Sequence, residues 1–168
     1  MIRFFTFSAF HNKHPIAGST QIRVQQLIKY WPEAGNYKYG ENPDCLIFQK
    51  VYVTPDYRFP LNFEKKKILD ICDPDWMNGV TDIALTISGM DAVVCPTKNL
   101  QKFLQQLTDK PVVVIKYRFD IALIPNTCKV HKRPAKEVVW FGYSHNAEAL
   151  RYALPLLEEL NLKLTIIA

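Results

Sequence analysis

The chain has 168 residues, of which 48% are hydrophobic and 22% charged, and its formal net charge is +5 at pH 7. This length and composition exclude a disordered chain and a disulfide-stapled mini-protein, and fit one ordered domain or one domain with part of a second. The basic balance favours anionic partners such as nucleotide phosphates, nucleic acid or a membrane surface.

Neither the apolar runs nor the cysteines point to a membrane or a metal. No run approaches the roughly 18 apolar residues of a membrane span, and the amino-terminal segment lacks the cleavage site of a signal peptide. The four cysteines form no C-x-x-C pair, which argues for reduced thiols rather than a zinc site or a disulfide framework. These features predict a cytoplasmic protein with no membrane span, no bound metal and no resident cofactor.

Short apolar runs recur along the chain and predict strands. Their apolarity is continuous rather than alternating, as in strands that are buried on both faces of a parallel sheet. The runs are residues 2–7, 45–48, 68–72, 92–95, 112–115, 138–141 and 162–167.

Helical patterns lie between several of these runs. Residues 19–31 have apolar side chains at helical spacing, with Ser19 or Thr20 as N-cap and Pro32 as the stop. Residues 97–107 repeat the pattern behind Thr97 as N-cap, and in 146–160 Pro155 should kink or split the helix. This alternation predicts an open doubly wound, mostly parallel, Rossmann-like α/β sheet.

The order of elements also predicts a domain organisation. Residues 1–120 form the Rossmann-like domain, and residues 121–137, with two prolines and a cluster of charges, read as a linker. Residues 138–168 form one further βαβ unit, which either starts a second, truncated domain or adds to the first sheet.

Candidate binding residues follow the strands, because ligands of open parallel sheets bind beyond the carboxyl ends of the strands. The loop "IAGST" places Gly18, Ser19 and Thr20 at a helix start, where free N–H groups can hold a phosphate, a carboxylate or a sugar hydroxyl. Neither a dinucleotide-binding nor a P-loop motif is present, so an ordinary capped helix remains the alternative.

Two histidines belong to the same group of loop residues. His14 precedes the "IAGST" loop and is suited to acid/base work, the alternative being a solvated loop histidine. His145 follows a later strand, where a neutral imidazole can bind a phosphate or a hydroxyl.

The segment "KILDICDPDW" sets carboxylates around the end of a strand. Asp73 and Asp75 bracket a proline, and they are either two catalytic carboxylates or turn residues that cap the next helix. Asp70 belongs to the strand itself and needs a buried partner.

Three segments in chain order resemble the first half of a GT-B type glycosyltransferase. They are "KILDICDPDW", "MDAVVCPTKNLQKFLQQLTDKPVVVIKYRFD" and "VVWFGYSHNAEALRYALPLLEELNLKLTIIA". In that family the amino-terminal Rossmann-like domain has a Gly-containing loop after its first strand, similar to "IAGST". The carboxyl-terminal domain opens with a strand that ends in Gly, as "VVWFG" does.

The resemblance implies transfer of a sugar from a nucleotide-sugar donor to an acceptor, without an obligatory metal. Asp73, Asp75 or His14 would act as the base, with Trp76 beside them as a binding residue. Gly18, Ser19 and Thr20 would line the cleft between the two domains. The loop after the first strand of the second domain would lie near the donor phosphates; its residues are Gly142, Tyr143, Ser144 and His145.

Several further interpretations stay open. The family's donor domain is a full sheet, whereas this chain has one βαβ unit there. The chain is then a fragment of a longer enzyme, a shortened relative, or a non-catalytic Rossmann-like binding module for a nucleotide, a sugar or a protein partner. The basic residues in 129–136 also allow nucleic-acid binding.

Overall fold

The computed structural model describes residues 1–10, 16–117, 120, 122 and 134–168. The chain divides into two compact units, unit 1 from Met1 to Ile124 and unit 2 from Pro125 to Ala168.

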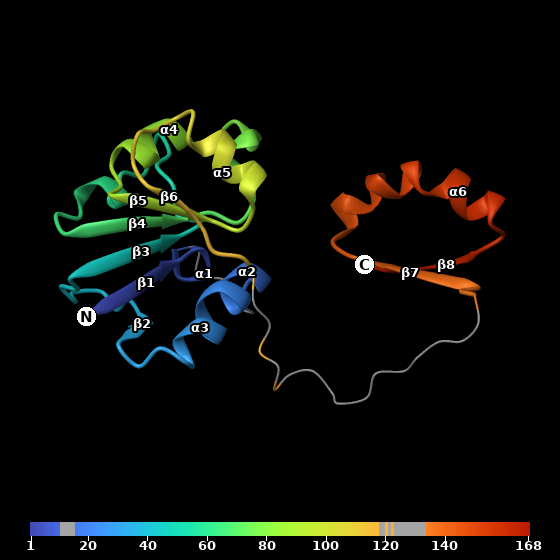
Figure 1. The fold of residues 1–168 in the computed structure, drawn as a ribbon, viewed down its shortest axis with the longest axis horizontal. Coiled ribbons are helices and arrows are strands. Elements are labelled where there is room, and N and C mark those ends of the chain that lie inside the picture. Colours follow the sequence, from blue (N-terminus) through green and yellow to red (C-terminus); the bar gives the residue numbers. More distant parts are fainter. Residues whose placement is uncertain (11–15, 118–119, 121, 123–133) are drawn as a thin grey trace. The chain divides into compact units, whose positions relative to one another are not determined.

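Unit 1 is built on a six-stranded sheet in which every strand pair is parallel, in the order β2-β1-β3-β4-β5-β6 (Figure 1). An α/β fold with a parallel, Rossmann-like sheet was predicted and is confirmed. The strands are β1 (Ile2–Thr6), β2 (Ala34–Asn36), β3 (Cys45–Gln49), β4 (Lys66–Asp70), β5 (Ala92–Cys95) and β6 (Val112–Val114).

The apolar runs locate five of these strands to within two residues at each end. The sixth, β2, was not predicted because its sequence, Ala-Gly-Asn, contains no apolar run. It is a three-residue edge strand whose position is set by pairing with Ile2, Arg3 and Phe4 of β1.

Helices cover both faces of the sheet (Figure 1). After the short α1 (Phe7–Phe10), one face carries a continuous helix of α2 (Gly18–Thr20), a π-helical turn (Gln21–Gln25) and α3 (Gln26–Ile28), named here the α2–α3 helix. The opposite face carries α4 (Ile83–Ser88) and α5 (Lys98–Leu104).

Two of the helix starts can be compared with the sequence. Thr97 caps α5 as predicted, because its side chain accepts a hydrogen bond from the Leu100 N–H. The prediction of Ser19 or Thr20 as N-cap is wrong: the helix begins at Gly18 with Ala17 in the cap position. The Thr20 hydroxyl points inward instead and donates to Gln49.

The hydrophobic core is unequal on the two faces. The α4 and α5 face holds the larger cluster, in which Phe48, Leu69 and Ile87 are fully buried. The α2–α3 face holds a smaller cluster around Phe4, Val24 and Ile47. Because burying such a side chain contributes about 1.5–3 kcal/mol, most of the apolar stabilisation of unit 1 lies on the α4 and α5 face.

Unit 2 is a βαβ unit. Its strands, β7 (Glu137–Phe141) and β8 (Lys163–Ile167), pair with each other in a parallel two-stranded sheet, apart from the six strands of unit 1. A 3₁₀ helix (Ser144–Tyr152) and α6 (Leu154–Glu159) connect them, with Pro155 in the first turn of α6. The split predicted at this proline is confirmed, since Pro cannot donate within a helix but fits its first turn.

Among the described residues no helix has both the length and the apolar character needed to cross a membrane.

Candidate active site at the carboxyl edge of the sheet

The carboxyl ends of β1, β3 and β4 meet at the place where the strand order changes direction. From β1 the chain crosses to β2 on one side and then returns to β3 on the other. Such a switch point opens a crevice in doubly wound sheets and is their usual ligand site.

An ion-pair cluster occupies this edge. Lys50, the residue after β3, places its Nζ 2.9 Å from Asp73 Oδ2 and 3.0 Å from Asp75 Oδ1. Tyr52 donates its hydroxyl to Asp75 Oδ2 at 3.0 Å, and the Cys72 thiol lies 3.2 Å from Asp73 Oδ2. These five side chains are called the carboxyl-edge cluster.

The backbone positions the lysine. Lys50 has φ of 54°, which is uncommon for a residue with a side chain, and its N–H donates to the Asp70 carbonyl at 3.0 Å. This turn carries Lys50 off β3 toward the loop that follows β4. Asp73 and Asp75 therefore share one ammonium group, although Lys50 and Asp73 are 23 residues apart.

The electrostatics of the cluster follow from burial and pairing. Burial alone would raise the pKa of Asp73, but the hydrogen bonds from Lys50 and Cys72 outweigh it and hold the pKa below its ordinary value. Burial would lower the pKa of Lys50, and the two carboxylates raise it instead. The ion pair is thus fully charged at neutral pH. Burial raises the pKa of Cys72 to about 12, so its thiol stays protonated.

The two carboxylates differ in what they can still bind. Asp75 uses one oxygen for Lys50 and the other for Tyr52. Asp73 receives both of its contacts on Oδ2, and its side chain is 56% exposed, so Oδ1 is the oxygen that a bound molecule can reach. Asp75 therefore positions Lys50, while Asp73 presents an ionised oxygen to solvent.

Trp76 lies beside this cluster. It follows Asp75 in a 3₁₀ turn (Asp75–Asn78) and stacks on Phe103 of α5, with ring centroids 5.6 Å apart and planes 8° from parallel. Phe103 is itself exposed, so the stacked pair forms an aromatic surface next to the carboxylates.

The residues predicted in the "IAGST" loop separate. Gly18 is exposed and Ser19 half-buried at the start of the α2–α3 helix. Thr20 is buried and joins a chain of hydrogen bonds in which Ser8 Oγ donates to Thr20 Oγ1 at 3.1 Å, and Thr20 donates to Gln49 Oε1 at 2.8 Å. This chain fastens the helix start to the ends of β1 and β3, so Gly18 and Ser19 are the members of the loop that a ligand can touch.

Asp70 has the buried partner that the sequence required. Arg23 of the π-helical turn binds it through Nε at 2.8 and 3.0 Å and through its second terminal nitrogen. Both side chains are only 6% exposed, and the Tyr117 ring lies 5.2 Å from the guanidinium carbon. Burial tends to lower the pKa of Arg23, but the bond to Asp70 raises it above its ordinary value. This pair fixes the helix to the sheet.

The predicted donor loop follows β7 in unit 2. A Cβ on Gly142 would lie 3.0 Å from the Trp140 ring, so the glycine allows the chain to turn closely over that indole. Gly142 donates to the Ile167 carbonyl at 3.1 Å, after which Tyr143 and Ser144 start the 3₁₀ helix with exposed side chains. The loop is thus held to β8 by its glycine and presents its next two side chains outward.

Several predicted residues fall outside this description. His14 is not among the described residues, and of His145 only the backbone is described, within the 3₁₀ helix. Most of the basic segment 129–136 is also outside the described ranges. In the part of the chain that the structure describes, no three His, Cys, Asp or Glu side chains are placed to hold a metal ion.

Sequence reasoning assigned no role to Lys50, Tyr52 or Arg23. Lys50 and Tyr52 were detectable by position, since "QKVY" directly follows a strand in a parallel sheet. Arg23 carried no such signal within a helix of otherwise ordinary composition.

Comparisons with protein-family models, with curated proteins and with solved structures gave no match for this chain.

Proposed function

We propose that this chain supplies the acceptor-binding side of a GT-B type glycosyltransferase, which transfers a sugar from a nucleotide-sugar donor to an acceptor hydroxyl. The observation that most supports the proposal is the carboxyl-edge cluster, where Lys50 holds Asp73 and Asp75 beside the switch point of a parallel sheet. The sequence resemblance to that family supports it independently.

Asp73 is the base in this proposal. The acceptor hydroxyl lies against Asp73 Oδ1, which is ionised and reaches solvent. Asp73 takes the hydroxyl proton while the acceptor oxygen forms a bond to the anomeric carbon. The bond from that carbon to the nucleoside diphosphate breaks, and its electron pair leaves on the phosphate oxygen. The reaction is a single displacement with inversion.

The neighbouring side chains have supporting roles. Lys50 and Asp75 fix the Asp73 carboxylate, and Tyr52 fixes Asp75. The aromatic surface formed by Trp76 and Phe103 can contact the apolar face of a sugar ring. For the donor phosphates, the sequence resemblance assigns the loop of unit 2 that contains Gly142, Tyr143 and Ser144.

The test is binding and transfer with a panel of nucleotide sugars, on this chain and on any longer chain that contains it. A bound donor must raise the melting temperature of the folded protein. Asp73→Asn should keep the fold and reduce sugar transfer by about 10²–10⁴-fold, the usual contribution of a general base. Asp109→Asn, which changes an exposed carboxylate after α5, should leave transfer unchanged.

One result would contradict the proposed glycosyltransferase activity, and another would contradict the role given to Asp73. Binding of a nucleotide sugar without transfer to any acceptor would favour the non-catalytic Rossmann-like binding module. Transfer that survives Asp73→Asn undiminished would remove Asp73 as the base.

A further inference from the structure

Cys72 belongs to the carboxyl-edge cluster but has no role in the mechanism given above. It is 7% exposed and lies two residues after β4, where the Ile71 N–H donates to the Val94 carbonyl at 2.9 Å. The chain then bends at Asp73, whose carbonyl accepts from the Asp75 N–H at 2.9 Å. Cys72 therefore stands on backbone that is held on both sides, directly beside the Asp73 carboxylate.

Two contacts fix the direction of the thiol. Its proton is donated to Asp73 Oδ2, and the sulfur lies 3.2 Å from that oxygen. The sulfur also shares a hydrogen bond with the Tyr117 hydroxyl. Because the thiol has a single proton and Asp73 receives it, the Tyr117 hydroxyl is the donor in this second bond. Tyr117 therefore turns the S–H bond of Cys72 toward the carboxylate.

Tyr117 is itself held from the other side. Its ring lies 5.2 Å from the guanidinium carbon of Arg23. Arg23 is in turn fixed by its buried ion pair with Asp70. The buried pair is thus connected through Tyr117 and Cys72 to the exposed carboxylate of Asp73.

A thiol suits this position because it is a weak hydrogen-bond donor. A base must keep its affinity for a proton, and every hydrogen bond to an ionised carboxylate lowers that affinity. At Asp73 burial raises the proton affinity, and Lys50, 2.9 Å from the same oxygen, already lowers it. A hydroxyl in place of the thiol would lower it further, whereas the thiol orients the carboxylate with a smaller loss of basicity.

We propose that Cys72 is a positioning residue for Asp73: its thiol, aligned by Tyr117, holds Oδ2 so that Oδ1 faces the acceptor hydroxyl. The inference rests on the proposed function, in which Asp73 is the base. Two substitutions separate the donor from the space that it fills. Cys72→Ala removes the donor, and Cys72→Ser replaces it with a stronger donor of similar size.

The first test follows the titration of Asp73 by carbon-detected NMR on the full chain, with Asp73→Asn identifying its signal. Loss of the donor in Cys72→Ala should raise the pKa of Asp73, and the stronger donor in Cys72→Ser should lower it. Tyr117→Phe should raise the pKa of Asp73 by less than Cys72→Ala does, because the thiol remains but is no longer polarised by the hydroxyl. A side chain that only fills space would not give shifts in opposite directions.

The other groups that face Asp73 do not obscure this titration. Burial raises the pKa of Cys72 to about 12 and also raises that of Tyr117, so both stay protonated where Asp73 titrates. The remaining charged or titratable neighbours are the same in every variant; they are Lys50, Asp75, Tyr52 and Arg23.

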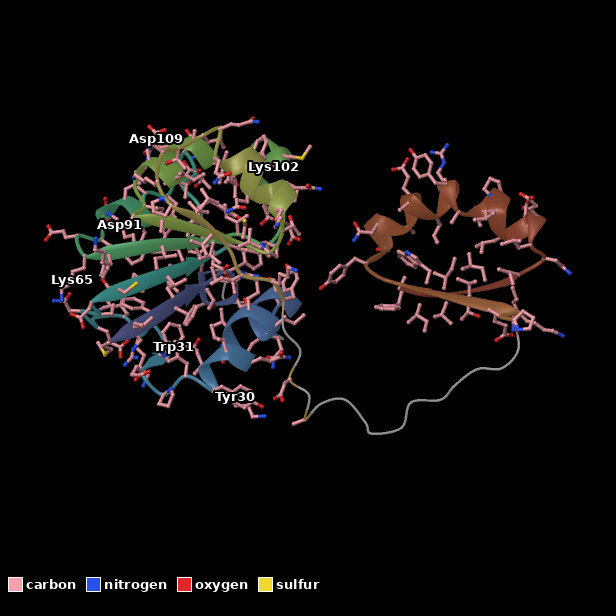
Figure 2. The ribbon with its side chains drawn as sticks, in the orientation of Figure 1. Tyr30, Trp31, Lys65, Asp91, Lys102 and Asp109 are labelled. Carbon is pink, nitrogen blue, oxygen red and sulfur yellow. The ribbon has the colours of Figure 1, made fainter. Side chains whose placement is uncertain are left out.

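Cys45 provides the matched control. It is a half-buried cysteine at the amino-terminal end of β3, with Asp91 among its charged neighbours. Figure 2 labels Asp91 and Lys65 at that edge of the sheet, away from the carboxyl ends of the strands. Cys45→Ala and Cys45→Ser should leave the titration of Asp73 unchanged, since neither alters a contact of its carboxylate.

The second test is sugar transfer by this chain or by a longer chain that contains it. Cys72→Ala should reduce kcat by about tenfold and leave the KM for the acceptor unchanged, because a base outside its productive geometry loses rate steeply. Cys72→Ser should recover part of this loss, since it restores the orientation of Asp73 at a lower basicity.

Shifts of the Asp73 pKa in the same direction in Cys72→Ala and Cys72→Ser, or no shift in either, would overturn the positioning role whether or not the chain transfers sugar. Opposite shifts in a chain that transfers no sugar would support the orienting contact and contradict only the proposed function. If Cys72→Ala does not fold, Tyr117→Phe, at a 40% exposed position, takes its place. Its shift must then be opposite to that of Cys72→Ser.

Discussion

Arg23 and Asp70 form an ion pair whose side chains are almost completely removed from water. Loss of one partner leaves a buried charge with nothing to compensate it, whereas loss of both leaves an apolar site. The pair therefore matters for stability mainly through what happens when it is broken.

Arg23→Met should lower the free energy of unfolding by about 3–5 kcal/mol, because the Asp70 carboxylate is then left buried and unpaired. The double variant Arg23→Met with Asp70→Leu should recover most of this loss. Urea denaturation, with the slope checked for two-state behaviour, measures both. A single variant as stable as the unchanged chain would mean that water replaces the guanidinium.

Lys50 gives the carboxyl-edge cluster a defined pH dependence. Because the pKa of Asp73 is lowered in the folded protein, its ion pair with Lys50 stabilises the fold at pH values above the unfolded-state pKa of about 3.9. This stabilisation is lost as the pH falls through the folded-state pKa of Asp73. Because the pKa of Lys50 is raised in the folded protein, its contribution to stability is complete at pH values below the unfolded-state pKa of about 10.4. This contribution is lost only as the pH rises through the folded-state pKa of Lys50.

Lys50→Met should therefore be less stable than the unchanged chain at neutral pH, and this difference should shrink in strong acid. Urea midpoints of both proteins at neutral pH, at the unfolded-state pKa of Asp and below it measure the difference. A difference that grows on acidification would show that Asp73 is not the partner that matters.

At the scale of elements, the stability of α4 depends on the hydrogen bonds of its N-cap residue, Asp82. Asp82 precedes the helix and accepts the Leu85 N–H at 2.8 Å, and its own N–H donates to the Val53 carbonyl. One residue thus caps α4 and connects it to the chain beyond β3.

Asp82→Ala should cost about 1 kcal/mol of unfolding free energy, since the capping acceptor is lost while the backbone contact with Val53 remains. Asp82→Asn, which can still cap, should cost clearly less. Thermal or urea unfolding of the two variants gives the comparison, and equal losses would assign the effect to the carboxylate charge instead of the cap.

The elements also show what the sequence can predict. A strand buried on both faces is mostly apolar, so β3 and β5 were visible as nearly continuous apolar runs and β1 as a run interrupted by Arg3. The edge strand β2 escaped because only its pairing with β1 defines it. Asp70 was recognised as needing a partner, but Arg23 lies 47 residues away and meets it only through the packing of helix on sheet. The position of Lys50 after β3 was detectable, but its pairing with Asp73 and Asp75 depends on long-range packing in the same way.

At the scale of the whole molecule, the two units differ in how much they bury. Unit 1 contains two clusters of buried apolar side chains. In unit 2 no described residue is fully buried, and Val139, Phe141 and Ile167 of its strands are more than half exposed. An isolated pair of strands is marginally stable in water, and the helical layer of unit 2 leaves none of its described residues fully buried.

A chain shortened to residues 1–124 should therefore unfold at the same urea midpoint as the full chain, because unit 1 holds the buried clusters. Unit 2 on its own should show no cooperative transition. Denaturation of the two fragments beside the full chain checks this, and a lower midpoint for residues 1–124 would mean that unit 2 stabilises unit 1.

The place of β1 in the sheet has a practical consequence for experiments on this protein. Residue 2 already pairs with both β2 and β3, and the amino group of Met1 lies 2.6 Å from Asp44, at the edge of the sheet opposite the carboxyl-edge cluster. A biotin or affinity handle attached at Met1 would anchor unit 1 to a sensor surface by its far edge. Asp73, Trp76 and the switch point would then face the flowing solution.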